Sequence, residues 1–214
     1  MNLLIMGPAG SGKGTMSDII TDEFPINHIS TGDMLRAAFK NGTEVGKEAK
    51  QFMDEGKLVP DSVILKMVEE RLNEDDCKNG FLFDGFPRTL VQAKAFDIML
   101  LKINKKVDAV INLTVDFSAL SSRITGRRVC KNCGAIYHVV NQPPIIEGVC
   151  NVCGSELYQR SDDTIEQLTV RLEEYNELTK PVLAYYKKQN IVKNINASQH
   201  INEVYTDVKK VLIK

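Results

Sequence analysis

Nine residues near the start of the chain have the types and order needed to hold a phosphate chain. The stretch 7–15 reads Gly-Pro-Ala-Gly-Ser-Gly-Lys-Gly-Thr and follows the apolar run 3–6. Glycines let successive backbone N–H groups turn toward one anion, and a following helix adds the partial positive charge of its N-terminus. Lys13 would then reach the terminal phosphates, and Thr15 would support Mg²⁺. Gly14 occupies the usual Ser/Thr position of this motif, and the alternative is a glycine-rich turn without a ligand.

Four cysteines form a second motif that can do chemistry. Cys130 and Cys133 make one C-x-x-C pair, and Cys150 and Cys153 make another after sixteen intervening residues. This spacing is typical of zinc sites with four thiolate ligands. A reducing compartment favours zinc, with iron or disulfides as the alternatives. The fifth cysteine, Cys77, has no partner in the sequence, and we expect an ordinary thiol.

Composition limits the class of protein. The 214 residues are 43% hydrophobic and 26% charged, which suits one α/β domain with insertions or two small domains. No apolar run could span a bilayer and no signal region is visible, so we expect a cytoplasmic protein without a membrane partner. The net charge of −1 argues against a nucleic-acid partner. Arginine, which binds phosphate with two parallel hydrogen bonds, is concentrated in the candidate segments at Arg36, Arg88, Arg123, Arg127, Arg160 and Arg171.

Two further segments carry charged residues directly after extended runs. After Ile29, Ser30 or Thr31 is expected to cap a helix with Asp33 in its first turn and Arg36 one turn later. A capped surface helix with one ion pair is the alternative to a second nucleotide site. A further helix over 44–55 ends at Gly56, and the pattern predicts that Asp61 caps the next one.

The strand predicted over 81–83 stops at Asp84. A carboxylate just past a buried strand is where P-loop proteins hold the Mg²⁺ shell. Arg88 and Gln92 lie four residues apart at the start of the next helix, and therefore on one face of it. A plain Asp-Gly turn is the alternative.

The rest of the pattern alternates strands and helices. A buried strand over 107–113 precedes a helix over 117–124, which implies a parallel sheet with helices on both faces. From Gly126 to Asp163 the helical period is lost, and this stretch is expected to be a small β-rich insertion held by metal. One long helix over 164–187, a strand over 191–195 and a helix over 201–212 complete the prediction.

The motifs together resemble adenylate kinase, in its long-lid bacterial form with a zinc-bearing lid. The resemblance covers essentially the whole chain, because 7–15, 30–33, 83–89, 125–128, 137–138 and 158–160 match in order and spacing. It implies the α/β fold of P-loop nucleoside monophosphate kinases, with a five-stranded parallel sheet flanked by helices and a cis peptide at Phe86–Pro87. It also implies a core of residues 1–29, 60–126 and 164–214, a helical AMP-binding insertion at 30–59 and a zinc-binding lid at 127–163.

The resemblance also implies an activity, ATP + AMP ⇌ 2 ADP, with Mg²⁺ bound to ATP and a structural Zn²⁺. We expect a monomer, since no exposed apolar stripe is evident in the sequence. The AMP contacts it implies are Thr31, Arg36, Lys57, Leu58, Val59, Gly85, Arg88, Gln92, Arg160 and Arg171. The ATP contacts are Gly10, Ser11, Gly12, Lys13, Gly14, Thr15, Arg123, Arg127, Ile136, Tyr137 and Gln199. The catalytic set is Lys13, Asp84, Arg88, Arg127, Arg160 and Arg171, and Asp162 and Asp163 orient the lid.

The sequence departs from the family pattern at a few positions. Pro8 and Ala9 differ from the usual phosphate loop, and Met16 replaces a frequent glutamine. Asn141 and Gln142 stand where the lid normally carries Phe-Asn before two prolines. Because that phenylalanine helps to hold the donor adenine, we expect weaker or less base-selective ATP binding.

No general base is expected. The second pKa of a phosphate monoester is about 6, so the attacking oxygen of AMP is already largely ionised at neutral pH. None of the histidines, His28, His138 and His200, has a convincing position for a base. The alternatives are a kinase for GMP, UMP or CMP, a P-loop regulatory switch, and a zinc-ribbon nucleic-acid binder.

Overall fold

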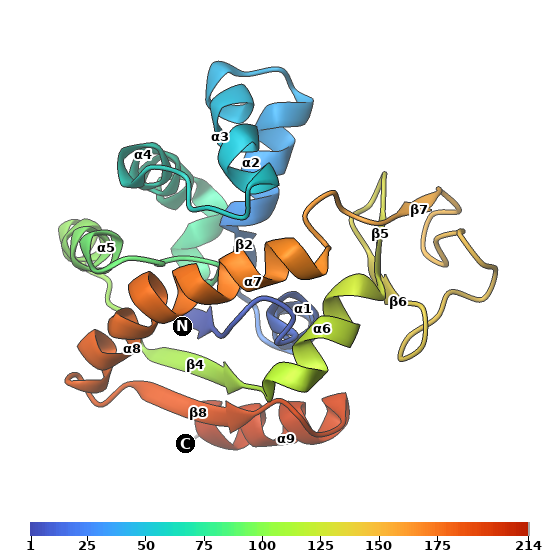
Figure 1. The fold of residues 1–214 in the computed structure, drawn as a ribbon. Coiled ribbons are helices and arrows are strands. Elements are labelled where there is room, and N and C mark those ends of the chain that lie inside the picture. The colour runs from blue at the N-terminus through green and yellow to red at the C-terminus, as the bar shows by residue number, and fades with distance from the viewer. Residues whose placement is uncertain (214) are drawn as a thin grey trace.

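The computed structural model describes residues 1–213, and a five-stranded parallel sheet lies at its centre (Figure 1). The strand order is β2-β3-β1-β4-β8, which confirms the predicted fold class. Strand β1 lies in the middle, and its neighbours β3 and β4 both run parallel to it. The strands are β1 (Asn2–Met6), β2 (Asn27–Ser30), β3 (Phe81–Asp84), β4 (Ala109–Thr114) and β8 (Val192–Asn196).

Helices cover both faces of this sheet. Alternate residues of β1 serve the two faces: Leu4 and Met6 join one hydrophobic cluster, while Leu3 and Ile5 join the other. The first cluster includes residues of α4 (Asp61–Leu72), α5 (Leu90–Lys102) and α8 (Lys180–Lys187). The second is closed by α1 (Lys13–Glu23) and α9 (Ile201–Leu212).

Two helices stand out from the sheet beyond β2, at the top of Figure 1. These are α2 (Thr31–Lys40) and α3 (Glu44–Asp54). As expected, a capping side chain begins α2: the Ser30 hydroxyl accepts the Asp33 N–H at 3.2 Å. A short 3-10 helix, η1 (Asp75–Asn79), follows α4 and leads into β3.

The predicted cap of α4 is wrong. Asp61 is the first residue of this helix, Pro60 precedes it, and no side chain caps the helix start. The Asp61 carboxylate instead accepts hydrogen bonds from Thr89 Oγ1 at 3.1 Å and from Gln92 Nε2 at 2.7 Å. These donors lie at the start of α5, so Asp61 connects α4 to α5 rather than closing its own helix.

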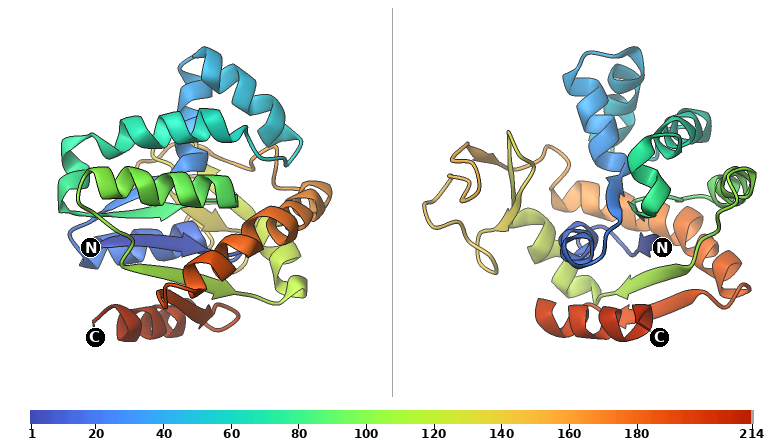
Figure 2. Two further views of the ribbon diagram at one scale, coloured as in Figure 1. Left: turned by 90° about the vertical axis from the view of Figure 1, so that its left-hand side faces the viewer. Right: turned by 180° about the vertical axis from the view of Figure 1, so that it is seen from behind.

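A small antiparallel sheet projects from the body of the molecule (Figures 1 and 2). Its strand order is β6-β5-β7, and it lies between α6 (Phe117–Thr125) and α7 (Ile165–Glu174) in the chain. This is the β-rich stretch that the loss of helical period indicated. Its strands are β5 (Arg127–Cys130), β6 (Ile136–His138) and β7 (Leu157–Tyr158).

The helix predicted over 164–187 is continuous but not regular. A π-helical segment, η2 (Tyr175–Thr179), separates α7 from α8. Within it, the Thr179 hydroxyl donates to the Arg88 carbonyl at 3.0 Å, which fixes the helix against the loop after β3. Such π segments recur at functional sites, and nothing in the hydrophobic period distinguishes them from an α-helix.

Every strand of the large sheet has its carboxyl end on the same edge, because all the pairings are parallel. The glycine-rich loop follows β1 at this edge, and Asp84 ends β3 there. The first residue of the chain and the end of α9 lie toward the opposite edge (Figure 2). Within residues 1–213, no helix combines the length and apolar character needed to cross a membrane.

Candidate active site

A large cavity of about 1270 Å³ opens at the carboxyl edge of the sheet. The glycine-rich loop, helices α2 and α7 and strand β6 of the small sheet all contribute to its walls. A second pocket of about 80 Å³ adjoins it beside α2 and the segment 56–59. Clefts at this edge of a parallel α/β sheet are the usual ligand sites of such folds.

The glycine-rich loop needs two of its glycines for their backbone conformation. Gly10 and Gly12 have φ angles of 82° and 92°, in the left-handed region that other residues avoid. Gly14 lies close to the small sheet, because a Cβ there would be 3.3 Å from Ile136 Cδ1 and would require that flexible side-chain end to shift by a few tenths of an ångström.

Lys13 folds back onto its own loop. Its ammonium group donates to the carbonyls of Gly7 at 2.9 Å and Pro8 at 3.0 Å. Burial lowers the pKa of Lys13 to about 8, although the nearby Asp84 carboxylate opposes this shift. The ammonium group remains mostly charged at neutral pH, and an anionic phosphate in the loop would raise its pKa again, so the site favours a polyanion.

Asp84 projects into the cavity beside a histidine. His28 lies between two carboxylates, with Nδ1 3.0 Å from Asp18 Oδ1 and Nε2 3.8 Å from Asp84 Oδ2. Burial alone would lower the pKa of His28, but the two carboxylates raise it to about 9. Burial likewise opposes ionisation of Asp84, yet His28 and Lys13 hold its pKa below the usual range. At neutral pH the pair is therefore a cation and an anion.

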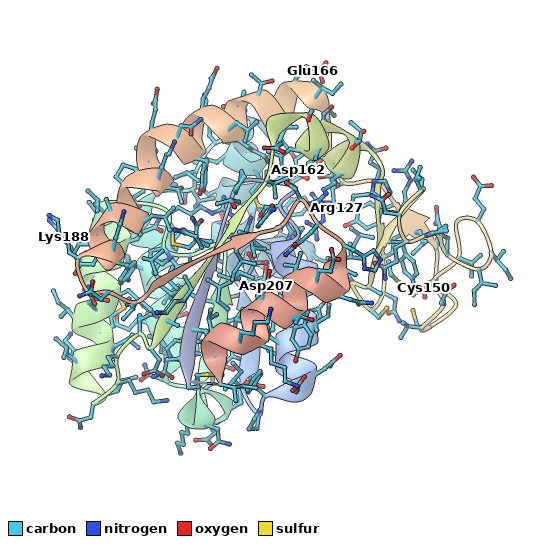
Figure 3. All side chains as sticks on the ribbon, turned by 90° about the horizontal axis from the view of Figure 1, so that it is seen from below. Arg127, Cys150, Asp162, Glu166, Lys188 and Asp207 are labelled. Carbon is cyan, nitrogen blue, oxygen red and sulfur yellow. The ribbon has the colours of Figure 1, made fainter. Side chains whose placement is uncertain are left out.

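The arginines reach the cavity from separate elements and are held by acidic residues. Arg127 at the start of β5 donates to the fully buried Asp163, with Nε 2.8 Å from Oδ2. Arg171 of α7 pairs with Asp162. Burial and then the positive charge of Arg127 lower the pKa of Arg171, so these cations repel one another in a poorly solvated space. Figure 3 shows Arg127 and Asp162 near the junction between the large sheet and the projecting small sheet.

Two further arginines share one carboxylate on α2. Arg36 donates to Asp33 through Nε at 3.1 Å and through a second nitrogen at 2.5 Å. Arg160 approaches the same carboxylate at 3.6 Å from the segment that follows β7. In addition, the Ser161 hydroxyl donates to Asp54 at 3.1 Å. The end of the small-sheet segment thus contacts α2 and α3 directly.

The smaller pocket is built by hydrogen bonds around the loop after β3. The Arg88 N–H donates to Gln92 Oε1 at 2.7 Å, and the amide of the same Gln92 donates to Asp61. The Thr31 hydroxyl donates to the Gly85 carbonyl at 3.0 Å. This network fixes the orientation of the Gln92 amide, which lies at the wall of the pocket.

The structure brings most of the predicted site residues to these two spaces. The large cavity is lined by Gly10, Ser11, Gly12, Lys13, Gly14, Thr15, Arg36, Leu58, Asp84, Gly85, Arg88, Arg123, Arg127, Ile136, Tyr137, Arg160, Arg171 and Gln199. Thr31, Lys57, Val59, Gln92 and Asp162 line only the smaller pocket, and Asp163 lines neither. The Tyr137 hydroxyl faces away from the cavity, because it accepts the Asn151 N–H at 2.8 Å.

Several polar groups line the large cavity outside the phosphate loop and the smaller pocket. Arg123 donates to the Ala197 carbonyl at 2.9 Å, and the Gln199 amide donates to Asp207 at 2.8 Å. Asn141 and Gln142 of the small-sheet segment line the same cavity. A flat heterocycle here would meet a guanidinium and amides.

The four motif cysteines lie together. Their sulfur atoms are all within 4.8 Å of one another, with Cys130 and Cys153 3.4 Å apart and Cys133 and Cys150 3.6 Å apart. A zinc ion with four thiolate ligands at about 2.3 Å has sulfur–sulfur separations of about 3.8 Å, so the cluster fits Zn²⁺. Four thiolates would complete the tetrahedral shell of such an ion and leave no position for a substrate, as in structural zinc sites.

Sequence reasoning missed several residues at the cavity. Asp18, Glu174, Tyr175 and Thr179 all line it. Three of these lie on the α7–η2 stretch, and their position depends on the π-helical turn. His28 could have been found from the strand order, because Ser30 of β2 pairs with Asp84 of β3 and so brings the ends of these strands together.

Comparison with known proteins gives one consistent result. Residues 5–191 match the sequence profile of the family described as adenylate kinase. An adenylate kinase of Desulforamulus reducens is 57% identical over 208 residues, covering 97% of this chain and 98% of that protein. One of Carboxydothermus hydrogenoformans is 53% identical over 214 residues and the full length of both. One of Archaeoglobus fulgidus is 48% identical, covering 100% of this chain and 99% of its own.

Removing metal from the cysteine cluster should loosen the small sheet. Its cluster of buried residues holds Cys130, Tyr137, Cys150 and Leu157, two of which are thiols. We expect a strong chelator to lower the melting temperature and to speed amide exchange over 127–163, while amides of β1 stay protected. The measurements are calorimetry and hydrogen exchange followed by mass spectrometry.

The control is Cys77→Ser, which changes a buried thiol outside the cluster and should leave the zinc content at one per chain. Loss of activity on chelation with unchanged melting and exchange would contradict a structural site.

Proposed function

Because this chain belongs to the adenylate kinase family, whose reaction converts ATP and AMP into two ADP, we propose that it transfers the phosphoryl group by charge stabilisation under a closed lid, without a general base. One observation carries this proposal. Lys13, Arg88, Arg127, Arg160 and Arg171 come from distant parts of the chain and line one cavity beside the glycine-rich loop. Groups of this kind stabilise the charge that spreads over a moving phosphoryl group.

We assign the two nucleotides to the two ends of the site. The small pocket suits the base of AMP, because Val59, Leu35 and Ile64 give it apolar walls and the Gln92 amide a polar contact. The glycine-rich loop suits the phosphates of ATP, with its base near Arg123 and Gln199. AMP would then contact Thr31, Arg36, Lys57, Leu58, Val59, Gly85, Arg88, Gln92, Arg160 and Arg171. ATP would contact residues 10–15, Arg123, Arg127, Ile136, Tyr137 and Gln199.

Asp84 is assigned to Mg²⁺. Its pKa is held below the usual range, so the carboxylate is ionised and can accept hydrogen bonds from water on the ion. Thr15 lines the same cavity and offers a hydroxyl. Mg²⁺ bound with ATP supplies charge neutralisation at the phosphates. The protein side of the task is to orient these phosphates, which falls to Lys13 and the arginines.

The absence of a base from the mechanism has a physical reason. The attacking atom is a phosphate oxygen of AMP with no proton to lose at neutral pH. His28 is the histidine nearest to Asp84, and its pKa of about 9 makes it a cation under these conditions. A protonated imidazole cannot accept a proton, so His28 contributes positive charge instead.

Lid closure is proposed to exclude water, which would otherwise hydrolyse ATP. We assign residues 127–163 to a lid, 30–59 to an AMP-binding insertion, and 1–29, 60–126 and 164–214 to the core. Contacts from Arg160 to Asp33 and from Ser161 to Asp54 support this division, since they join the two insertions over the cavity. Asp162 and Asp163 orient Arg171 and Arg127 from the lid side.

The proposal includes a structural Zn²⁺ on Cys130, Cys133, Cys150 and Cys153. It places the reaction in the cytoplasm, where thiols stay reduced and can ligate metal. It also describes a monomer, because this one chain supplies every residue assigned to the site.

The activity itself can be tested by supplying four acceptors. With MgATP as donor, AMP should be phosphorylated faster than GMP, UMP or CMP, because Arg88 and Asp61 fix the orientation of the Gln92 amide, which offers one pattern of polar contact to the acceptor base. Formation of ADP is followed by a coupled assay. Faster turnover with another monophosphate would assign a different kinase, and no turnover with any of them would overturn the proposal.

Arg88→Lys should nearly abolish turnover while the fold survives. The backbone N–H and carbonyl of Arg88 make the contacts to Gln92 and Thr179, so the loop keeps these bonds in the variant. A lysine cannot form the two parallel bonds of a guanidinium with phosphate, and we expect kcat to fall about 10³-fold. Arg71→Lys is the matched control, since Arg71 pairs with Asp76 away from both pockets. An equal loss in both variants would contradict the assignment.

Asn141→Phe should tighten ATP binding. An aromatic ring at this wall can stack on the donor base, which contributes about 1 kcal/mol, or about fivefold in KM for ATP. The preference for ATP over GTP should rise as well. Val140→Phe adds the same ring to the neighbouring, 75% exposed position and serves as the control. An unchanged KM for ATP in Asn141→Phe would show that the base lies elsewhere.

A further inference from the structure

The imidazole of His138 joins the small sheet to helix α6. Its Nε2 lies 3.0 Å from the Ser122 carbonyl, while Nδ1 lies 3.1 Å and 3.0 Å from the backbone nitrogens of Val140 and Asn141. A carbonyl only accepts, so Nε2 carries the proton, and two N–H donors require a lone pair on Nδ1. The neutral ring therefore uses both of its nitrogens, one on each side of the boundary between lid and core.

Gly126 is the residue that makes room for this ring. Its φ and ψ of −82° and −7° are open to any amino acid, so its backbone does not require glycine. A Cβ there, however, would lie 2.3 Å from His138 Nε2 and 2.6 Å from Cε1. The Val139 N–H also donates to the Gly126 carbonyl at 2.9 Å. The glycine of the Thr-Gly-Arg-Arg motif is thus explained by close packing against His138.

The contact connects two walls of the large cavity. Ser122 precedes Arg123, which lines the cavity. On the other side, His138 and Gln142 pair through both backbone bonds, at 3.0 Å and 3.2 Å, and close the turn that carries Asn141. We call residues 138–142 the lid hairpin. In Figure 1, α6 runs directly to the base of the small sheet.

We propose that His138 is a positioning residue for the donor nucleotide, locking the lid hairpin to α6 so that Arg123, Asn141 and Gln142 move as one body. This inference rests on the proposed function, because it takes this end of the cavity to hold ATP. Gly126 is the necessary counterpart, since only a residue without a side chain admits the ring.

A double-mutant cycle tests the lock. His138→Ala should raise KM for ATP about tenfold and leave KM for AMP within about twofold, because the acceptor pocket lies elsewhere. Gly126→Ala should do the same by displacing the ring. Adding Gly126→Ala to His138→Ala should cause no further change, because the ring is already gone. Val140→Ala, in the same hairpin, should behave as the unaltered protein.

His138→Asn separates the two halves of the contact. Asparagine can still accept the backbone N–H groups of the hairpin as an Asx turn, but it is too short to reach Ser122. We expect its KM for ATP to match that of His138→Ala. A normal KM for ATP in His138→Asn would show that the cross-link to α6 is not what positions the donor.

Other results overturn the proposal. Additive effects of the two substitutions would do so, as would a lower melting temperature with both KM values unchanged, which indicates a purely structural contact. If the unaltered protein forms no ADP from ATP and AMP, the proposed function fails separately. Calorimetric binding of a non-hydrolysable ATP analogue then tests whether His138 positions the donor nucleotide. An unchanged affinity for the analogue in His138→Ala would overturn this proposal.

Discussion

The structure depends on holding like charges close together around one cavity. Lys13, six arginines and the protonated His28 line the large cavity, against four acidic side chains, Asp18, Asp33, Asp84 and Glu174. Burial, and then the repulsion between these cations, lowers the pKa values of Lys13, Arg160 and Arg171 below their usual range. A row of phosphates is the natural counter-charge for such an arrangement.

Acidic side chains and backbone carbonyls compensate much of this positive charge. Lys13 is satisfied by the carbonyls of its own loop, and Arg127 and Arg171 by two buried aspartates at the end of the lid. Asp33 serves both Arg36 and Arg160, although these belong to different parts of the chain. Each of these five cations therefore has a partner that a phosphate could replace.

The sequence predicted what depends on local patterns. The glycine-rich loop, the carboxylate after β3 and the C-x-x-C pairs are local signals, and each lies where the alternation of strands and helices puts it. Contacts across the fold were not visible. Asp61 looks like a helix cap, but its carboxylate binds Thr89 and Gln92, some thirty residues away. The π-helical turn before Lys180 and the packing of His138 on Gly126 have the same origin, because each depends on a neighbour that only the tertiary structure supplies.

The direction of the large sheet has a practical consequence. The two proposed insertions, residues 30–59 and 127–163, lie at its carboxyl edge, whereas Met1 and the end of α9 lie toward the other edge (Figure 2). A tether, a fluorophore or a fusion partner joined to either terminus would therefore lie behind the sheet, away from both insertions. The termini are accordingly suited to surface immobilisation and to single-molecule recording of the proposed lid closure.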